Sequence, residues 1–417
     1  MSTPADVEAL ARLAKSASRR LASLETGAKN AVIEDVAAEL LARTPEILEA
    51  NAADTHAAGQ KNLEPSKLKR LELTGQSLAR LALGLRQLIT LPDPIGAVTE
   101  EKTVPSGLRV RRVRVPLGVI LMIYEARPGV TIDAFALCFK AGNACILKGG
   151  REAERSNTAL AAIVHRVLEK HGIPREALTL VRTIDESDFK SLLQCTDSID
   201  LVIPRGGEGL IRFVAANSRI PTIQHYKGVC HIFVDESADQ ARAIDVCVNA
   251  KVSAPATCNA AECILVHKNI VHMFLPGLDA ALAKAGVEIR ADARALPHLQ
   301  HACSAGSGDF GREFLDMVVA VKVVDGVSDA IAHIAAFGSR HTEAILSASE
   351  DSIRAFRAGV DASCVIVNAS TRFNDGFELG LGAEIGISTS KLHSYGPMGL
   401  EDLTARRFEV SGDFQTR

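Results

Sequence analysis

One cysteine in the chain lies in surroundings that suit covalent chemistry. Residues 250–267 read AKVSAPATCNAAECILVH, so Cys258 and Asn259 belong to a loop of small residues just before an apolar run. A thiolate at Cys258 could attack a substrate carbonyl carbon, and the backbone N–H groups of Cys258 and Asn259 could stabilise the resulting oxyanion. Spacing alone leaves a second interpretation open, because most intracellular cysteines are small buried hydrophobic residues.

Two glycine turns predict anion binding. The turns Lys148-Gly149-Gly150 and Arg205-Gly206-Gly207 each follow a short apolar run and precede a helical pattern. Glycine lets the backbone approach a ligand closely, and helix N-termini favour anions. Neither turn is a G-x-G-x-x-G or Walker motif, and one such turn is more often only a tight turn. Two of them at the strand ends of one sheet favour a dinucleotide site.

The elements around these turns predict two α/β domains. Residues 5–90 show helical spacing, and from residue 117 short apolar runs alternate with amphipathic helices, a pattern that restarts after an expected helix at 240–250. Apolar strands between helices are typical of doubly wound parallel sheets, whose ligands bind at the carboxyl ends of the strands. Residues 108–115 alternate apolar and charged side chains, which predicts a ribbon that either pairs across an oligomer interface or is an ordinary surface hairpin.

The composition is that of an ordinary globular protein. The 417 residues carry a formal net charge of −3, with 47% hydrophobic and 23% charged residues, so we expect no nucleic-acid surface. Neither a signal peptide nor an 18-residue apolar run is visible, which predicts no membrane contact and a cytoplasmic location. Nine cysteines without close pairing fit a reducing compartment. Cys258 and Cys263 lack the partners of a zinc site, so we expect no metal.

Several motifs occur in an order that is typical of one enzyme family. They are Ile123-Tyr-Glu-Ala-Arg-Pro128, Lys148-Gly-Gly150, Arg205-Gly-Gly207, Thr257-Cys-Asn-Ala260, His341-Thr-Glu-Ala344, Asn368-Ala-Ser-Thr-Arg372, Gly382-Ala-Glu-Ile-Gly-Ile-Ser-Thr389 and Gly396-Pro-Met-Gly-Leu400. Over nearly its whole length the chain resembles the γ-glutamyl phosphate reductases of the aldehyde dehydrogenase superfamily. The resemblance implies an aldehyde dehydrogenase-like α/β fold, with two doubly wound parallel-sheet domains and a small oligomerisation ribbon.

The resemblance also implies domain roles and an activity. It places an NADP-binding domain at 1–97 and 116–245, a catalytic cysteine domain at 246–385, and an oligomerisation element at 98–115 and 386–417. The implied reaction is the NADPH-dependent reduction of L-glutamyl 5-phosphate to L-glutamate 5-semialdehyde with release of phosphate, through a cysteine thioacyl intermediate. This is the second step of proline biosynthesis. A homo-oligomer, dimer or tetramer, is implied, with glutamate 5-kinase as a candidate partner.

Carried over residue by residue, the resemblance assigns a role to each motif. Cys258 becomes the nucleophile, with Asn259 beside it. Lys148, before Gly149 and Gly150, takes the position that holds the adenosine ribose and could meet a 2′-phosphate. The turn Arg205-Gly206-Gly207 lies where the superfamily flanks the pyrophosphate and nicotinamide. Glu313 matches the carboxylate that binds the nicotinamide ribose, with an ordinary helix-surface glutamate as the equal alternative.

Other polar residues are candidates for the substrate. Glu125 and Arg127 could bind its amino and carboxylate groups, or could form a local salt bridge, and Arg372 is a further candidate for a carboxylate or phosphate. Aldehyde-oxidising relatives place a glutamate before a Gly-Gly pair, whereas residues 224–228 read QHYKG. A reductase has no use for a hydrolytic base. His225 and His231 could act as bases, although structural histidines are the favoured interpretation.

The chain departs from the family at four positions, which are Ala254, Gly129, Arg340 and Tyr395. The family usually has arginine at the first and last of these, asparagine at the second and glycine at the third. The missing guanidinium at 254 weakens the argument for acyl phosphate recognition, and Arg340 is a candidate replacement. Two rival functions follow: an acylating enzyme that takes another donor, such as a coenzyme A thioester, and a non-catalytic relative retained for binding. Rapid alkylation of Cys258 would argue for the enzymes.

Overall fold

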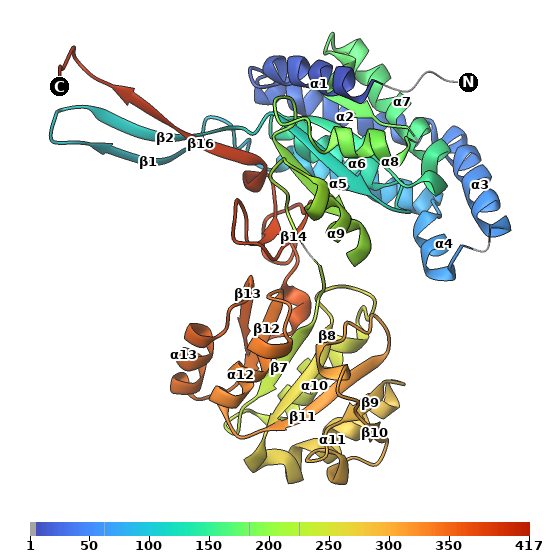
Figure 1. Ribbon diagram of the computed structural model, residues 1–417, viewed down its shortest axis with the longest axis vertical. Coiled ribbons are helices and arrows are strands. Elements are labelled where there is room, and N and C mark those ends of the chain that lie inside the picture. The colour runs from blue at the N-terminus through green and yellow to red at the C-terminus, as the bar shows by residue number, and fades with distance from the viewer. Residues whose placement is uncertain (1–5, 62, 183, 225) are drawn as a thin grey trace. The chain divides into compact units, whose positions relative to one another are not determined.

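The computed structural model describes residues 6–61, 63–182, 184–224 and 226–417, which form two compact units (Figure 1). Unit 1 contains the chain up to residue 224 together with 381–386 and 398–417, and unit 2 contains 226–380 and 387–397. Each unit has its own sheet and its own hydrophobic core.

Five helices open unit 1, as the helical spacing predicted. They are α1 (Val7–Leu21), α2 (Thr26–Ala42), α3 (Thr44–Gln60), α4 (Pro65–Leu71) and α5 (Gly75–Thr90). Local sequence signals set their limits: Thr74 and Ser77 form a reciprocal capping box at the start of α5, and α5 ends just before Leu91 and Pro92. The apolar faces of α2 and α5 pack against each other, and Lys29 of α2 is buried beside Asp93.

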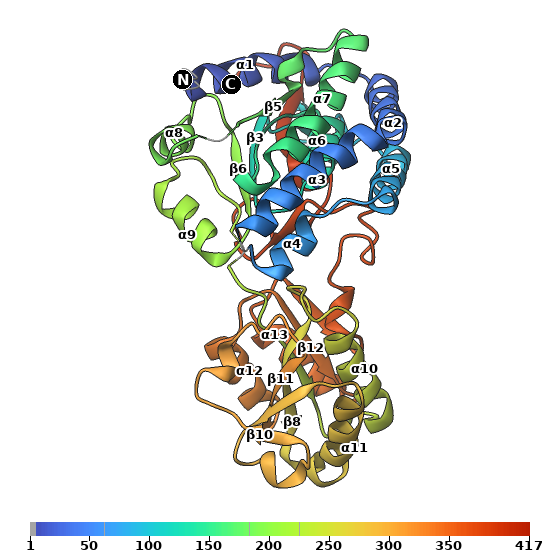
Figure 2. The same ribbon diagram turned by 90° about the vertical axis from the view of Figure 1, so that its right-hand side faces the viewer.

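The sheet of unit 1 is parallel and has the strand order β5-β4-β3-β6. Its strands are β3 (Val119–Tyr124), β4 (Ala144–Lys148), β5 (Leu178–Leu180) and β6 (Leu201–Arg205), connected through α6 (Val130–Lys140), α7 (Glu154–Lys170) and α8 (Glu186–Leu192), with α9 (Glu208–Asn217) after β6. Helices α6 and α7 pack against the sheet with α2, α3 and α5 outside them (Figure 2). The chain moves outward from β3 to β5 and then returns to the other side of β3. The carboxyl ends of β3 and β6 therefore form the topological switch point, where such sheets bind ligands.

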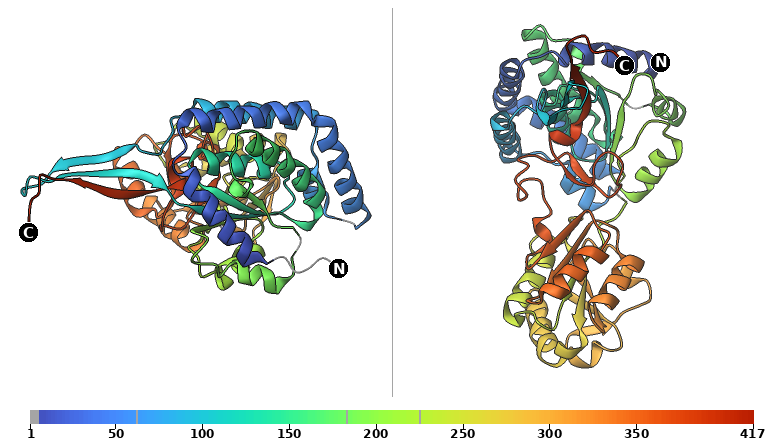
Figure 3. Two further views of the ribbon diagram at one scale, coloured as in Figure 1. Left: turned by 90° about the horizontal axis from the view of Figure 1, so that it is seen from above. Right: turned by 90° about the vertical axis from the view of Figure 1, so that its left-hand side faces the viewer.

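An antiparallel ribbon also belongs to unit 1. It consists of β1 (Val98–Thr103), β2 (Arg109–Pro116) and β16 (Thr404–Ser411), with Val113 opposite Arg407. Figures 1 and 3 show these strands side by side, projecting from the unit 1 sheet with the C-terminus near the tip. Strand β2, within the 98–115 stretch, pairs with β16 near the chain end. That these segments form an oligomerisation element stays a prediction. Phe408 and Val410 are exposed on it.

Unit 2 is built on a seven-stranded parallel sheet of order β10-β9-β11-β8-β7-β12-β13. The strands are β7 (Cys230–Val234), β8 (Ala261–His267), β9 (Glu288–Ala291), β10 (Ala302–Ser304), β11 (Val318–Val324), β12 (Thr342–Leu346) and β13 (Cys364–Val367). Helices α10 (Gln240–Val252) and α11 (Val271–Lys284) cover one face, and α12 (Val327–Phe337) and α13 (Glu350–Gly359) cover the other (Figure 2). Short strands β14 (Gly386–Ser388) and β15 (Gly396–Met398) pair near the chain end.

Side chains along each central strand alternate between the two faces of this sheet. Ile232 and Ile264 pack with α10 and α11, whereas Phe233 and Leu265 pack with α12 and α13. Strand β7 pairs with both β8 and β12, so it belongs to the second sheet. The boundary expected near residue 245 therefore falls later in the chain than the division in the structure.

None of the helices in the described ranges is both long enough and apolar enough to cross a membrane.

The buried ion pair of unit 1 yields a stability prediction. Lys29 Nζ lies 2.8 Å from Asp93 Oδ2, and the two side chains are only 1% and 9% exposed. Asp93→Ala leaves an ammonium group buried without its counter-charge, so the free energy of unfolding should fall by about 3–5 kcal/mol, as measured by urea denaturation. Glu34→Ala breaks the exposed Arg86–Glu34 pair and should cost less than about 1 kcal/mol. Equal losses in the two variants would contradict this account.

Candidate active site

Cys258 lies in the turn between α10 and β8. The turn is closed by the N–H of Ala260, which donates to the carbonyl of Thr257, and the Cys258 side chain is half-buried. Because β8 begins at Ala261, Cys258 lies at the amino end of a parallel strand. Ligands of doubly wound sheets usually bind at the carboxyl ends, so this site is the exception to the general rule used above.

The segment just before β7 packs against the backbone of the cysteine turn. A Cβ atom on Gly228 would lie 2.0 Å from the carbonyl oxygen of Cys258 and 2.6 Å from its Cα, so only glycine fits at this position. Two residues later, the buried thiol of Cys230 donates to the same carbonyl at 3.1 Å. Backbone contact and thiol together fix the position from which the Cys258 side chain projects.

Arg372 connects the residues on either side of Cys258. It belongs to the short helix η6 (Thr371–Phe373), and its Nη1 donates to Thr257 Oγ1 at 2.9 Å and to Asn259 Oδ1. The Asn259 amide, which is 4% exposed, donates in turn to the carbonyl of Asn374 at 3.0 Å. The Nε of Arg372 is buried and has no hydrogen-bond partner within the described part of the chain. The structure therefore brings together three predicted residues: Cys258, Asn259 and Arg372.

Glu313 lies in a loop after the short helix η5 (Asp309–Gly311), so the helix-surface alternative is wrong. Its Oε1 accepts a hydrogen bond of 2.7 Å from the N–H of Gly228. The carboxylate thus contacts the same segment that holds the cysteine turn.

A buried ion pair supports this loop, and the sequence analysis missed it. Lys251 Nζ lies 2.6 Å from Glu262 Oε2, and Glu262 Oε1 accepts from the N–H of Leu315 at 3.1 Å. Burial raises the pKa of Glu262 to about 7, although the Lys251 ammonium beside it favours the charged form. Both residues occur in the stretch around Cys258, but their alternation with apolar neighbours gave no sign that they face each other.

In unit 1, the predicted residues at the ends of β3 and β6 are neighbours at the switch point. Tyr124 is opposite Arg205, and the Glu125 carboxylate accepts from the N–H of Gly207 at 3.2 Å. A Cβ on Gly206 would lie 2.7 Å from Leu210 Cδ2 and 2.9 Å from Glu125 Cδ, so a larger residue would displace one of these side chains. Arg127 is exposed, and its N–H donates to the carbonyl of Glu125.

Lys148 ends the neighbouring strand β4. Its Nζ lies 5.2 Å from the centre of the Phe189 ring, and its pKa is lowered by burial and by Arg151. The next residue, Gly149, has no room for a side chain, because a Cβ would lie 2.2 Å from Asn157 Nδ2. The half-buried Lys148 ammonium therefore lies next to a glycine turn. A small cavity beside this turn is lined by Gly149, Gly150, Glu154, Asn157, Leu180, Val181 and Arg182.

The remaining candidate residues either make other contacts or lie outside the residues that the structure describes. Arg340 adopts a left-handed φ of 61°, which glycine would tolerate better, and its exposed side chain pairs with Asp361 at 3.7 Å. Tyr395 donates to the same carboxylate at 3.3 Å. His231 is fully buried on β7 and hydrogen-bonds Glu343, in agreement with a structural histidine, whereas His225 lies outside the described residues.

The close approach of Gly228 predicts a steric effect. Gly228→Ala forces the cysteine turn away from β7, so the free energy of unfolding should fall by about 1–3 kcal/mol in a urea titration, the usual cost of overpacking. Gly209→Ala, in α9 with no atom within 4 Å of the new Cβ, is the matched control and should be neutral or stabilising. A Gly228→Ala protein as stable as this control would refute the contact.

Glu262 predicts a pH dependence. Because the pKa of about 7 in the folded state lies above the group's ordinary value of 4.5, the folded state binds the proton more tightly than the unfolded state. The stability from this group is therefore complete below about pH 4.5 and is lost as the pH rises through 7. Between pH 5.5 and 8, the stability of the parent relative to Glu262→Gln should fall by about 2 kcal/mol in denaturant titrations. A constant difference across this range would show that Glu262 is ionised throughout.

The chain is similar to known enzymes of one family over most or all of its length. The family model "Aldehyde dehydrogenase family" matches residues 1–296. The γ-glutamyl phosphate reductase of Solidesulfovibrio magneticus is 51% identical over 418 residues, covering 100% of both chains. That of Xanthomonas campestris is 49% identical over 411 residues, covering 99% of each.

Solved structures match the same family and confirm the predicted aldehyde dehydrogenase-like fold. The crystal structure of γ-glutamyl phosphate reductase from Thermotoga maritima matches with a TM-score of 0.96 at 39% identity, over 99% of this chain and 100% of that one. An acetylating aldehyde dehydrogenase from Geobacillus thermoglucosidasius, with a TM-score of 0.69 and 16% identity over 99% and 97% of the two chains, shares the fold alone. The chain therefore belongs to the γ-glutamyl phosphate reductases, a family of aldehyde dehydrogenase-type oxidoreductases.

Proposed function

We propose that the protein reduces L-glutamyl 5-phosphate to L-glutamate 5-semialdehyde with NADPH and releases phosphate, as the second step of proline biosynthesis. The observation that carries this proposal is the Arg372 guanidinium, which hydrogen-bonds the residues on both sides of Cys258. A fixed cation beside a nucleophile suits an anionic acyl phosphate. The names of the full-length relatives support the same substrate.

Cys258 is the proposed nucleophile. Its thiolate attacks the acyl carbon, the carbon–oxygen bond to phosphate breaks, and the acyl group remains on the sulfur as a thioester. The backbone N–H groups of Cys258 and Asn259 are the proposed oxyanion donors, and one such donor typically contributes about 3–4 kcal/mol to the transition state. The Asn259 side chain is engaged with Asn374, so its part is to hold the turn.

Arg372 is the proposed phosphate or carboxylate ligand at this centre. Its Nη1 is oriented by Thr257 and Asn259, while Nε is buried without a partner among the described residues. A buried donor without a partner is costly, and an anionic oxygen of the substrate would satisfy it. The same guanidinium would balance negative charge as the phosphate departs.

The residues of unit 1 fit a nicotinamide dinucleotide. Members of the family use such a cofactor, and the bound NADPH supplies the hydride for the reduction. Lys148 provides a half-buried cation for a ribose or a 2′-phosphate, while Gly149 and Gly206 each lie where a Cβ would collide with a neighbouring side chain. Turns of glycine without side chains allow a backbone to approach a diphosphate group closely. From unit 2, Glu313 is the proposed ligand of the nicotinamide ribose.

The substrate's amino and carboxylate groups are assigned to Glu125 and Arg127. Glu125 is positioned by the N–H of Gly207, and Arg127 is exposed two residues later. Residues 224–228 contain no carboxylate that could activate water against the thioester. Shielding from hydrolysis is what a reductase needs, because water attack would waste the acyl group.

Assembly and location complete the proposal. The ribbon of β1, β2 and β16 exposes Phe408 and Val410 and leaves two strand edges, which suits pairing into a homodimer or tetramer. We place the protein in the cytoplasm, where glutamate 5-kinase could hand over the labile acyl phosphate.

A coupled assay tests the function. With glutamate 5-kinase, glutamate and ATP, the parent should oxidise NADPH, and coenzyme A thioesters should not replace this donor. Cys258→Ser should lower kcat by at least about a thousandfold, because it removes the thiolate. Cys303→Ser, at an exposed cysteine on β10, is the matched control and should keep the parent's rate.

Arg372 is tested in the same assay. Arg372→Met should lower kcat/KM by about a hundredfold, since it removes a charge-assisted contact to the acyl phosphate, with Arg372→Lys in between. Arg357→Met, at an exposed position on α13, controls for loss of charge. Turnover only with a coenzyme A thioester, or an Arg372→Met protein as active as the control, would overturn the assignment.

A further inference from the structure

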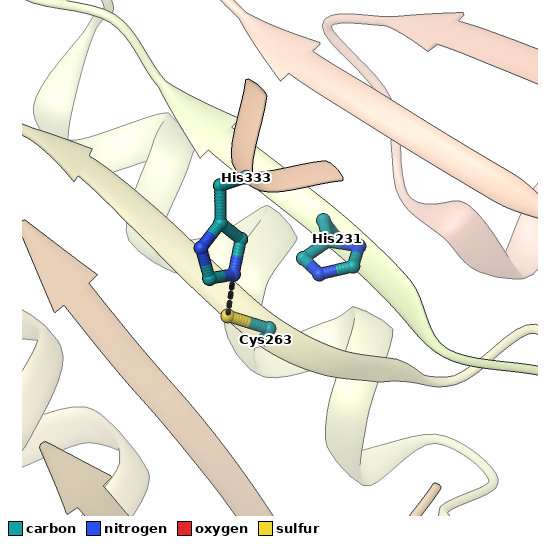
Figure 4. A group of neighbouring side chains, drawn as sticks. All are labelled: His231, Cys263 and His333. Atoms are coloured by element: carbon teal, nitrogen blue, oxygen red, sulfur yellow. Dashed lines mark hydrogen bonds between the residues drawn. The ribbon is translucent and has the colours of Figure 1, made fainter. Parts of the chain in front are cut away.

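Three side chains that could bind a metal ion converge inside unit 2. They come from three elements: His231 from β7, Cys263 from β8 and His333 from α12. All three are buried, and one ligand atom from each lies within 4.8 Å of the other two. Cys263 Sγ is 3.9 Å from His333 Nε2. Figure 4 shows the His333 ring directed toward the Cys263 sulfur, with the His231 ring beside them.

The Glu343 carboxylate fixes the orientation of the His231 ring. The N–H of His231 donates to Glu343 Oε2 at 2.9 Å, and His231 Nδ1 lies 2.9 Å from the same oxygen. A carboxylate hydrogen bond to one ring nitrogen is the support that metal-binding histidines usually have, because it directs the lone pair to the other nitrogen. His231 Nε2 is buried and has no hydrogen-bond partner among the residues described. Such an atom is costly unless something binds it.

Lys322 lies beside His333 Nδ1, and this contact allows a competing interpretation in which the cluster is a chain of hydrogen bonds without a metal. Lys322 Nζ lies 3.2 Å from His333 Nδ1, so the lysine could donate to Nδ1 while Nε2–H points to Cys263. This chain of hydrogen bonds satisfies His333 and Cys263 but leaves His231 Nε2 unexplained. The Lys322 side chain is only half-buried and rests near the rings of Phe310 and Phe337, so it can move outward.

We propose that His231, Cys263 and His333 form a binding site for a soft divalent transition-metal ion, with zinc as the best fit. Two imidazoles and one thiolate are typical zinc ligands, bound at about 2.0–2.3 Å. In a tetrahedral site, such bonds place the ligand atoms roughly 3.3–3.8 Å apart, so side-chain shifts of about 1 Å close the present arrangement. On binding, the Cys263 thiol releases its proton and a sulfur–zinc bond forms, with no change of oxidation state.

The site is independent of the proposed reaction. The sequence led us to expect no metal, because Cys258 and Cys263 have no ligand partners near them in the chain. The two histidines are far from Cys263 in the sequence, so local spacing could not reveal them. The ion would join β7 and β8 to α12 across one face of the sheet. Because it would bind the folded chain only, zinc should raise the stability of unit 2 in proportion to its affinity.

Cobalt(II) is the probe for this site, since it takes zinc's geometry and has visible spectra. The full-length Cys258→Ser protein, which removes the half-buried reactive thiol, is stripped with a chelator and titrated with Co²⁺ and then Zn²⁺. We expect one equivalent of Co²⁺ with a thiolate charge-transfer band and tetrahedral d–d absorption. Zinc should displace it and raise Tm.

Variants assign the ligands. Cys263→Ala should abolish the charge-transfer band, and His333→Gln should weaken cobalt binding at least tenfold. Cys247→Ala is the matched control, a fully buried cysteine on the opposite face of the sheet, and should keep the parent's spectrum. Lys322→Met should tighten binding, because it removes a cation beside His333. Absence of the band in the Cys258→Ser protein, or its persistence in Cys263→Ala, would overturn the proposal without bearing on the reductase activity.

Discussion

The site depends on the close contact between the backbone at Gly228 and the carbonyl of Cys258. A nucleophilic cysteine must be held at a fixed place without being buried by the residues that hold it. Here a position without a side chain supports the turn, and the Cys230 thiol adds a hydrogen bond to the same carbonyl. The holding contacts are made to the backbone, so the Cys258 side chain projects from a fixed turn and stays half-buried.

Further interactions spread outward from this contact. The N–H of Gly228 binds Glu313, and the loop that carries Glu313 is held by Glu262 through Leu315. On the other side, Arg372 spans Thr257 and Asn259. The carboxylate proposed for the cofactor and the cation proposed for the substrate therefore depend on the same turn. A substitution at any of these positions should therefore change the position of the Cys258 sulfur through these contacts.

Local features of the sequence predicted much of this arrangement. The alternating strands and helices, the helical N-terminal region and the Cys258 turn all follow from periodicity and small-residue loops, which act over a few neighbouring residues. Glu125 and the Arg205 turn were predicted as separate features. Their meeting at the switch point required the strand order β4-β3-β6, which no local pattern specifies. Strand β7 was assigned to the first domain for the same reason.

Long-range pairs explain the rest of what the sequence could not predict. The Lys251–Glu262 pair and the cluster of His231, Cys263 and His333 look like ordinary residues in apolar surroundings until the sheet places them together. The helix-surface alternative for Glu313 failed because the chain there forms a loop after η5. Arg340 shows the opposite case, where an unusual residue type marks a left-handed backbone position.

The most direct test of the account is to detect the acyl group on the sulfur. The protein is mixed with acyl phosphate generated by glutamate 5-kinase, without NADPH, quenched in acid, digested and measured by mass spectrometry. The account predicts one glutamyl group on the peptide that contains Cys258, and its loss as semialdehyde when NADPH is added before the quench. Formation of semialdehyde on NADPH addition, with Cys258 unmodified throughout, would contradict it.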